Sequence, residues 1–255
     1  MNFADLHCHS TFSDGSFTPT QIVELAHQKG FKGVSLTDHD TTKGLPELFE
    51  AAKKYNLVAL SGIEFSCYHK NSSVHLLGYG FNLHHPAITR LEDKHLERRE
   101  ARNHAMVEKL KSLGIEVNLA EIKTDGVVGR PHIALLMVKK GYVSNLQEAF
   151  QKFLGEGKAA FVEAFTITLA ETIEAIHEAN GYAILAHPHL IDSSELFNQL
   201  LKYPLDGLEC YYSNFNRDQN ERYIKKVAQK EWIATGGSDF HGENKPYVAY
   251  GASFT

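Results

Sequence analysis

The sequence predicts an α/β fold, a barrel of seven strands interrupted by a small helical subdomain, and three observations support this prediction. Short apolar segments bounded by Gly, Pro or Asn recur along the chain, as expected for buried strands. Helical segments separate most of them, which is typical of a parallel sheet. Seven such strands in 255 residues favour a closed or nearly closed barrel over an open doubly wound sheet.

The expected elements follow one another along the chain. The strands are expected over residues 2–7, 33–38, 57–64, 74–81, 182–187, 207–211 and 232–238. The first helix follows the first strand, because Thr18 can cap it, Pro19 suits its first turn and Gly30 stops it. The other barrel helices are expected over residues 45–55, 168–180, 193–202 and 217–230. No Gly-x-Gly-x-x-Gly follows the first strand, so a dinucleotide-binding fold lacks its main fingerprint.

The alternation breaks in the middle of the chain, where the sequence turns polar and helical. Helices are expected there over residues 88–113, 133–140 and 146–154. We therefore expect a discontinuous barrel formed by residues 1–85 and 158–255, with residues 86–157 inserted as a helical subdomain. This insertion is either a structural cap or a lid; a lid is favoured because active sites of such barrels lie at the carboxyl ends of the strands.

Composition narrows the class of protein. The net charge is −5 without long blocks of one sign, which does not suit a nucleic-acid-coating or membrane-surface protein. No leader-like segment and no run of about 18 apolar residues is present, so we expect a cytoplasmic protein without membrane contact. Three distant cysteines argue against a disulfide framework. The 15 histidines are about twice ordinary usage and call for an explanation.

Histidines and carboxylates stand at or near almost every expected strand end. They are His7, His9, Asp14, Asp38, His39, Asp40, Glu64, His75, His187, His189, Glu209, Asp239 and His241. A lone His-x-His such as His7 and His9 is weak support for a metal site, although residues i and i+2 of a strand share one face. Seven strand ends that converge on one rim are much stronger support. Imidazole and carboxylate without thiolate suit Zn, Mn or Fe.

The sequence resembles the polymerase and histidinol phosphatase (PHP) phosphoesterases. The resemblance rests on residues 5–10 with 13–15, on 36–40, on 62–64, on His75, on 186–188 and on 238–241. It implies a distorted seven-stranded, TIM-like barrel with three divalent metal ions (Mn, Fe or Zn). The implied nucleophile is a hydroxide that bridges the metals, so Cys8 is expected to be a barrel-wall residue that faces away from His7 and His9.

The resemblance also implies a ligand set for each ion. One ion would be held by His7, His9, Glu64 and Asp239; a second by Glu64, His75 and His187; a third by Asp14, His39 and His241. Four polar neighbours are expected either to orient these ligands or to have a plain structural role: Asp38, Asp40, His189 and Glu209. The remaining histidines are expected at the surface: His27, His69, His84, His85, His95, His104 and His177.

A Gly-Arg-Pro-His segment in the insertion, residues 129–132, indicates the substrate. Arg130 suits phosphate oxygens, and His132 is a candidate phosphate contact or acid. The plain structural interpretation is a helix start with Pro131 in the first turn. The branch of the family that carries this segment hydrolyses nucleoside 3',5'-bisphosphates or removes nucleotides from the 5' ends of short RNA. We therefore expect a nucleotide or short RNA as substrate, and a monomer without a protein partner.

Other functions stay open at this point. The first alternative is a small-metabolite phosphatase, such as a histidinol phosphatase. An amidohydrolase would usually need a bridging lysine, and no Lys stands at an expected strand end. A non-catalytic regulatory domain would have lost ligands that are all present here. One departure from many relatives, Phe215-Asn216 in place of a His-Ser pair, bears on fine substrate preference.

Overall fold

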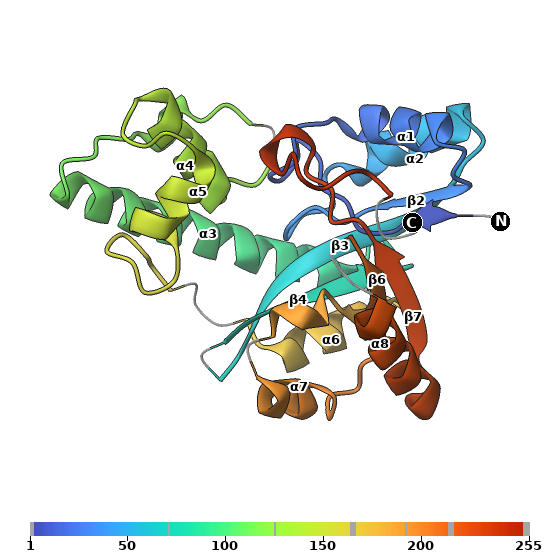
Figure 1. The fold of residues 1–255 in the computed structure, drawn as a ribbon. Coiled ribbons are helices and arrows are strands. Elements are labelled where there is room, and N and C mark those ends of the chain that lie inside the picture. Colours follow the sequence, from blue (N-terminus) through green and yellow to red (C-terminus); the bar gives the residue numbers. More distant parts are fainter. Residues whose placement is uncertain are drawn as a thin grey trace.

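The computed structural model describes residues 3–70, 72–124, 126–163, 167–191, 193–213 and 217–251. Within them, seven strands form one sheet in the order of the sequence (Figure 1). The strands are β1 Ala4–Asp5, β2 Gly33–Leu36, β3 Val58–His69, β4 Ser72–Tyr79, β5 Tyr182–Leu185, β6 Gly207–Tyr212 and β7 Ile233–Gly237. Each coincides with an expected strand; Asn2 of the first one lies outside the described residues.

The sheet curls until its first and last strands meet. The Leu6 N–H, just after β1, donates to the Gly236 carbonyl of β7 at 3.2 Å. Further along, Cys8 and Phe240 form an isolated parallel bridge. The prediction of a nearly closed seven-stranded α/β barrel is therefore confirmed.

The expectation of parallel strands is wrong for β4. This strand runs antiparallel to both β3 and β5, whereas the other neighbouring pairs are parallel. Only two residues separate His69 from Ser72, and a connection that short reverses the chain, whereas a parallel pair needs a crossover of a dozen or more residues. Strand β3 also continues to His69, five residues beyond its expected end.

Helices cover the outside of the barrel. They are α1 Pro19–Gln28, α2 Leu45–Lys54, α6 Leu169–Glu178, α7 Ser194–Leu200 and α8 Arg217–Lys230. The start of α1 is as expected: the Thr18 hydroxyl accepts from the Gln21 N–H, and the Gln21 side chain accepts from the Thr18 N–H. Gly30 follows the helix with φ 75°, a conformation that glycine adopts without strain.

The middle of the chain forms α3 Pro86–Ser112, a short 3₁₀ turn at Leu119–Glu121, α4 Arg130–Lys139, α5 Leu146–Ala149 and a π-helical turn at Phe150–Leu154. Helix α3 runs from the barrel to the other helices of this group (Figure 1). Its Ile88 and Leu91 belong to the barrel core, whereas Met106 and Leu110 belong to a second hydrophobic cluster with Ile133. The two clusters support our proposal that residues 86–157 are an inserted subdomain, although the second cluster extends to Ala160.

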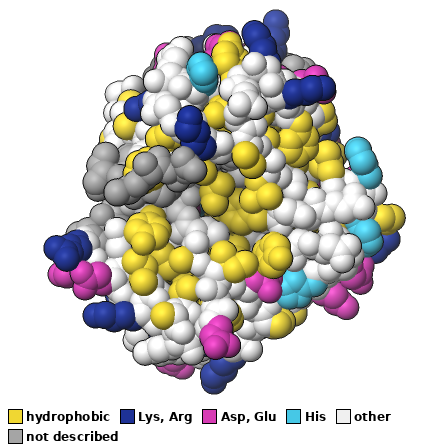
Figure 2. Space-filling view, turned by 90° about the vertical axis from the view of Figure 1, so that its right-hand side faces the viewer, with side chains coloured by type: hydrophobic (Ala, Val, Ile, Leu, Met, Phe, Trp, Pro, Cys, Tyr) yellow, Lys and Arg dark blue, Asp and Glu magenta, His cyan; other side chains and the backbone are white. Residues whose placement is uncertain are grey.

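The two ends of the barrel differ in character. Val58, Tyr182 and Ile233, the first residues of β3, β5 and β7, are exposed apolar side chains. Figure 2 shows one face of the molecule with hydrophobic side chains near its middle and most charged ones toward its edge. The carboxyl ends of the strands instead carry buried polar residues. No helix of the described residues is long and apolar enough to cross a membrane.

Candidate metal centre and adjoining pocket

Nine histidines and carboxylates meet at the carboxyl-end rim of the barrel. They are His7, His9, Asp14, His39, Glu64, His75, His187, Asp239 and His241, the nine predicted ligands. Seven of them stand in the loops that follow β1, β2, β5 and β7, because parallel strands of a barrel end on the same rim. The other two, Glu64 and His75, lie within β3 and the antiparallel β4. The rim therefore gathers residues that are up to 234 positions apart in the chain.

Glu64 of β3 lies at the centre of this group. Its Oε2 is 3.3 Å from His7 Nε2, 3.1 Å from His9 Nε2 and 3.2 Å from His39 Nδ1. Its Oε1 is 2.8 Å from His75 Nδ1 and 2.9 Å from His187 Nε2. One buried carboxylate is thus shared by five imidazoles.

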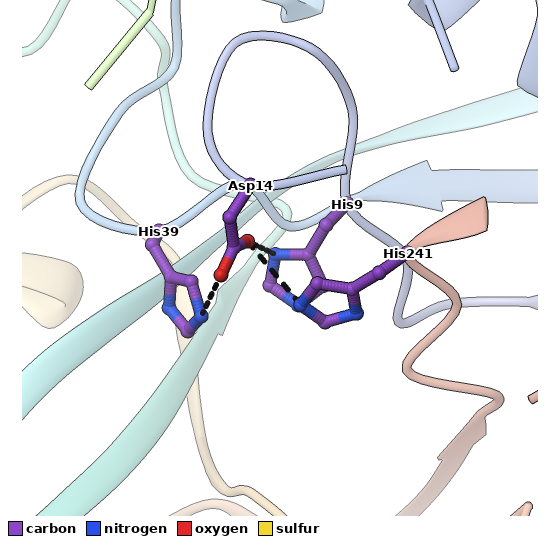
Figure 3. Close-up of side chains that lie close together, drawn as sticks. All are labelled: His9, Asp14, His39 and His241. Atoms are coloured by element: carbon purple, nitrogen blue, oxygen red, sulfur yellow. Dashed lines mark ion pairs between the residues drawn. The ribbon is translucent and has the colours of Figure 1, made fainter. Parts of the chain in front are cut away.

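The ligand atoms fall into three groups whose members lie within 4.8 Å of one another: His7, His9, Glu64 and Asp239; His9, Asp14, His39 and His241; and His39, Glu64 and His75. The first group is the set that the family resemblance implies for one ion. In the second, His9 joins the three expected residues; Figure 3 shows Asp14 between its three imidazoles. In the third, His39 stands where His187 was expected, but His187 Nε2 is 3.2 Å from His75 Nδ1.

Buried atoms without hydrogen bonds show that the group suits cations. Among the described residues, His7 Nε2, His9 Nε2, His39 Nδ1, His241 Nε2 and Glu64 Oε2 are buried and have no hydrogen-bond partner. Buried polar atoms in native proteins are almost always satisfied. Imidazole nitrogens and carboxylate oxygens that converge in this way are satisfied together by divalent cations such as Zn, Mn or Fe.

The charges of the cluster compensate one another. Burial disfavours the protonated His9 ring, but Asp239 and Glu64 outweigh it and raise the pKa of His9 to about 9. Burial also opposes ionisation of Asp14 and Glu64, but the surrounding histidines hold the pKa of both carboxyls well below the usual range. Burial lowers the pKa of His39 to about 3. In the absence of metal, protons on some of these histidines therefore balance the carboxylates.

Two of the predicted orienting residues contact the ligands or their loop. Glu209 of β6 lies between two ligands: its Oε1 accepts from His7 Nδ1 at 2.9 Å and its Oε2 accepts from the His187 N–H at 2.7 Å. Asp38 accepts from the Ser10 N–H at 2.7 Å and from the Ser13 hydroxyl at 2.5 Å. Asp38 thus fixes the loop that carries Asp14.

The other two predicted orienting residues, His189 and Asp40, lie beside other groups. The His189 ring is 4.8 Å from the Tyr212 ring and 6.4 Å from the His187 ring, centroid to centroid. The Asp40 carboxylate binds the Arg99 side chain of helix α3. Asp40 therefore faces the insertion.

Some residues of the site were not found from the sequence. Lys245 Nζ donates to Asp239 Oδ2 at 2.9 Å, and the Tyr212 hydroxyl donates to the same oxygen at 2.6 Å. Asp239 Oδ1, in contrast, faces His9 Nε2 at 3.1 Å. Lys245 was missed because it lies six residues after Asp239, beyond the last strand, where no strand pattern in the sequence indicates that it belongs to the site.

One expectation about the histidines is wrong. His95 is buried, not at the surface, because its ring packs on Phe65 of β3 and its Nδ1 lies 3.3 Å from Asp40 Oδ1. Leu91 and Ile88 lie on the same helix, one and two turns earlier, and pack on the barrel core. The apolar spacing of α3 could therefore have placed His95 on the buried face.

Cys8 has the wall position expected of it. It belongs to the hydrophobic core of the barrel, and its Sγ donates to the Ser35 carbonyl at 3.2 Å. Burial, with the nearby Asp5 and Asp38 carboxyls, raises the pKa of the Cys8 thiol well above its usual value. A thiol in this state is not a nucleophile.

A pocket adjoins the candidate metal ligands. Its volume is about 190 Å³. Asp14, His39 and His75 line one part of it. Residues of the insertion line another part: Arg98, Arg99, Arg102, Val127, Gly129, Arg130, Pro131, Phe150 and Glu156. Phe161 and Val162, just after the insertion, also line the pocket. The histidine-carboxylate cluster and the insertion thus share one cavity.

The Gly-Arg-Pro-His segment lies at this junction as the start of helix α4. The Arg130 guanidinium carbon is 5.8 Å from the Phe150 ring and 5.7 Å from the Phe161 ring, which fixes the side chain by cation–π contacts. His132 accepts from the Gly129 N–H through Nδ1 at 3.0 Å and also hydrogen-bonds the Ser13 backbone. His132 therefore connects the start of α4 to the loop of Asp14. Phe215-Asn216 lie outside the described residues.

The barrel, its rim of imidazoles and carboxylates, and the pocket beside that rim define a metal-dependent hydrolase of the α/β barrel class. The PHP domain model matches residues 5–234, and the chain therefore belongs to the PHP domain family. Over 93% of its length it is 35% identical to a 5'-3' exoribonuclease of Haemophilus influenzae, 89% of which is covered.

Two further comparisons agree with this family. Over 93% of its length, the chain is 29% identical to a 3',5'-nucleoside bisphosphate phosphatase of Chromobacterium violaceum, 86% of which is covered. A crystal structure described as a metal-dependent phosphoesterase from Bifidobacterium adolescentis superposes with a TM-score of 0.90 and 31% identity, covering 100% of this chain and 92% of that one. The chain is thus an enzyme of a phosphoesterase family.

Proposed function

We propose that this protein hydrolyses phosphate esters of nucleotides: nucleoside 3',5'-bisphosphates, and the 5'-terminal nucleotides of short RNA. The observation that carries this proposal is the single pocket that joins the histidine-carboxylate cluster to the Arg130 side of the insertion. A substrate with one phosphate at the cluster and a second charged group at Arg130 matches both parts. The names of the similar exoribonuclease and bisphosphate phosphatase support this choice.

In this proposal the three residue sets described above would each hold a divalent ion, and Glu64 belongs to two of these sets. Such ions lower the pKa of a bound water and stabilise the attacking and leaving oxygens at phosphorus. Glu209 orients His7 and His187 through the hydrogen bonds that it accepts. The Arg130 guanidinium, held by cation–π contacts with two aromatic rings, would donate hydrogen bonds to a phosphate. The buried Cys8 takes no part.

Substrate turnover tests the proposal directly. The Mn-loaded protein would be given adenosine 3',5'-bisphosphate, a 5'-phosphorylated dinucleotide, histidinol phosphate and a cyclic ribose phosphodiester, each at several concentrations. We expect the highest kcat/KM with the bisphosphate or the dinucleotide. His9→Ala, which removes a candidate ligand, serves as the inactive control. A preference for histidinol phosphate, or full activity of His9→Ala with no bound metal, would refute the proposal.

A further inference from the structure

Three arginines of helix α3 line the pocket that Asp14, His39 and His75 also line. They are Arg98, Arg99 and Arg102. Among the described residues, Arg98 Nη1 and Arg102 Nε and Nη2 are buried and have no hydrogen-bond partner. Guanidinium groups that are buried without partners are costly, and phosphate oxygens are their usual partners. These atoms therefore indicate an anion-binding wall on α3 that adjoins Arg130.

Electrostatic repulsion among the arginines also indicates an anion-binding site. Burial, and then the charges of Arg99 and Arg130, lower the pKa of Arg102 to about 9. Burial and the charge of Arg99 also lower the pKa of Arg130. Two carboxylates on this side of the pocket, Glu156 and Asp40, face four arginines, and Asp40 is fully engaged with Arg99. A bound anion would relieve this excess of positive charge.

Asp40 connects the arginine wall to the candidate metal ligands. It follows His39 directly and has φ 56°, an uncommon conformation for a residue with a side chain. Its N–H donates to the Glu64 carbonyl at 3.0 Å. Its Oδ1 accepts from the Ser66 N–H at 2.7 Å, and its Oδ2 accepts from Arg99 Nε at 2.7 Å and from Arg99 Nη2.

These hydrogen bonds fix the orientation of the Arg99 guanidinium. Two of its nitrogens are held by Asp40, so its remaining Nη1 points toward the start of α4. A side-chain carbon at Gly129 would lie 3.4 Å from that Nη1, an ordinary contact distance, so Nη1 lies beside the first turn of α4. The neighbouring Arg102 and Arg130 then complete one cationic surface. Asp40 thus connects the α3 wall to the loop that carries His39.

We propose that Asp40 is a positioning residue that holds Arg99 against the metal-bearing strand ends, so that Arg98, Arg99 and Arg102 bind the phosphate that is not hydrolysed. This inference rests on the proposed function and assigns a second phosphate site to it. The ligand class is a nucleotide with two separate phosphate groups. A simple aryl phosphate, which has one phosphate, does not reach the wall.

Kinetics with two substrates test the proposal. Asp40→Asn and Arg102→Met should each raise KM for adenosine 3',5'-bisphosphate about 10- to 100-fold, because each weakens charge-assisted hydrogen bonds to phosphate. In both variants kcat/KM for the bisphosphate should fall at least about tenfold more than kcat/KM for p-nitrophenyl phosphate, a difference that 1.4 kcal/mol represents. Glu121→Gln, which removes an exposed ion pair with Lys140 elsewhere in the insertion, is the matched control. Equal losses on both substrates, or weaker Mn binding in Asp40→Asn, would overturn the proposal.

A binding measurement separates this inference from the proposed function. Calorimetric titration of the metal-free protein with adenosine 3',5'-bisphosphate should show tighter binding than with adenosine monophosphate. Asp40→Asn and Arg102→Met should remove most of that difference. If the wild type binds the bisphosphate in this way but does not hydrolyse it, the proposed function fails while the arginine site stands. If neither variant reduces the difference, the arginine site is refuted, whatever the wild type hydrolyses.

Discussion

The two sides of the pocket are built in opposite ways. The histidine-carboxylate side collects residues from most of the strands and the loops after them, and five imidazoles surround the Glu64 carboxylate. The arginine side comes mainly from two adjacent turns of one helix, and its charges repel one another. In our proposals, cations complete one side and an anion completes the other. A phosphate ester with a second phosphate is the class of ligand that satisfies both.

The histidine-carboxylate side and the arginine side are also held in place by different parts of the fold. The ligands of the rim are fixed by strand pairing, which sets where each strand ends. The arginines depend on a helix whose second half packs in a separate hydrophobic cluster. Asp40, which bonds Arg99, and His132, which bonds the Gly129 and Ser13 backbones, connect the two sides. Changes on the rim should therefore abolish the chemistry, whereas changes on the arginine side should weaken binding.

Glu64→Gln should have the largest effect. The amide keeps the shape of the side chain but removes the charge that five imidazoles share, so more than one ion should be lost. We expect kcat/KM to fall by several orders of magnitude on every substrate, because the chemistry depends on the ions. Metal content after dialysis, measured by mass spectrometry, checks the cause. Wild-type metal content together with nearly wild-type activity would contradict the central place of Glu64.

Asp14→Ala and His241→Ala should be nearly as severe. Both residues belong to one ligand group, in which His241 Nε2 is 3.2 Å from Asp14 Oδ1. Each variant should retain one ion fewer than the wild type and lose several orders of magnitude in rate, again on all substrates. Metal stoichiometry and single-turnover rates provide the measurement. Loss of all metal from either variant would show that the groups do not fill independently.

Arg130→Ala should affect binding rather than chemistry. Loss of charge-assisted hydrogen bonds to phosphate predicts a rise of about 10- to 100-fold in KM for a bisphosphate, with kcat little changed. Hydrolysis of p-nitrophenyl phosphate should stay as in the wild type. Arg90→Ala is the matched control, because Arg90 lies exposed near the start of α3 and pairs with Glu178. An equal loss on the aryl phosphate would place Arg130 on the chemical side of the pocket.

The smallest expected effect is a dependence of Mn affinity on pH, which arises on the histidine-carboxylate side of the pocket. The pKa of His9 is raised from 6.5 to about 9, so its proton stabilises the metal-free protein fully below pH 6.5, and this contribution is lost as the pH rises through about 9. A metal ion must displace the same proton, so apparent Mn affinity should rise up to about tenfold per pH unit toward pH 9. Titrations at pH 6, 7, 8 and 9 measure this. Flat affinity across that range would show that His9 binds no metal.

Much of the site could be predicted from the sequence, because the residue types and their places after strands are local features. All nine expected ligands lie on one rim, and the family whose motifs they match is confirmed. Contacts across the pocket could not be predicted. Nothing local to Asp40 shows that it binds Arg99, 59 positions later, rather than a ligand beside it. His95 is a different case, because the spacing of Ile88 and Leu91 on the same helix could have placed it on the buried face; only its packing partner, Phe65 of β3, required the tertiary structure.

The sequence by itself determined seven strands, the helices between them and a set of histidines and carboxylates at the strand ends. Periodicity and turn residues act over a few positions, and they suffice for these features. Only the tertiary structure decided that β4 runs antiparallel, that Glu64 is shared by five imidazoles, and that Lys245 and Tyr212 hold one oxygen of Asp239. These depend on which distant segments meet in space, and that is settled when the barrel closes and buries its core.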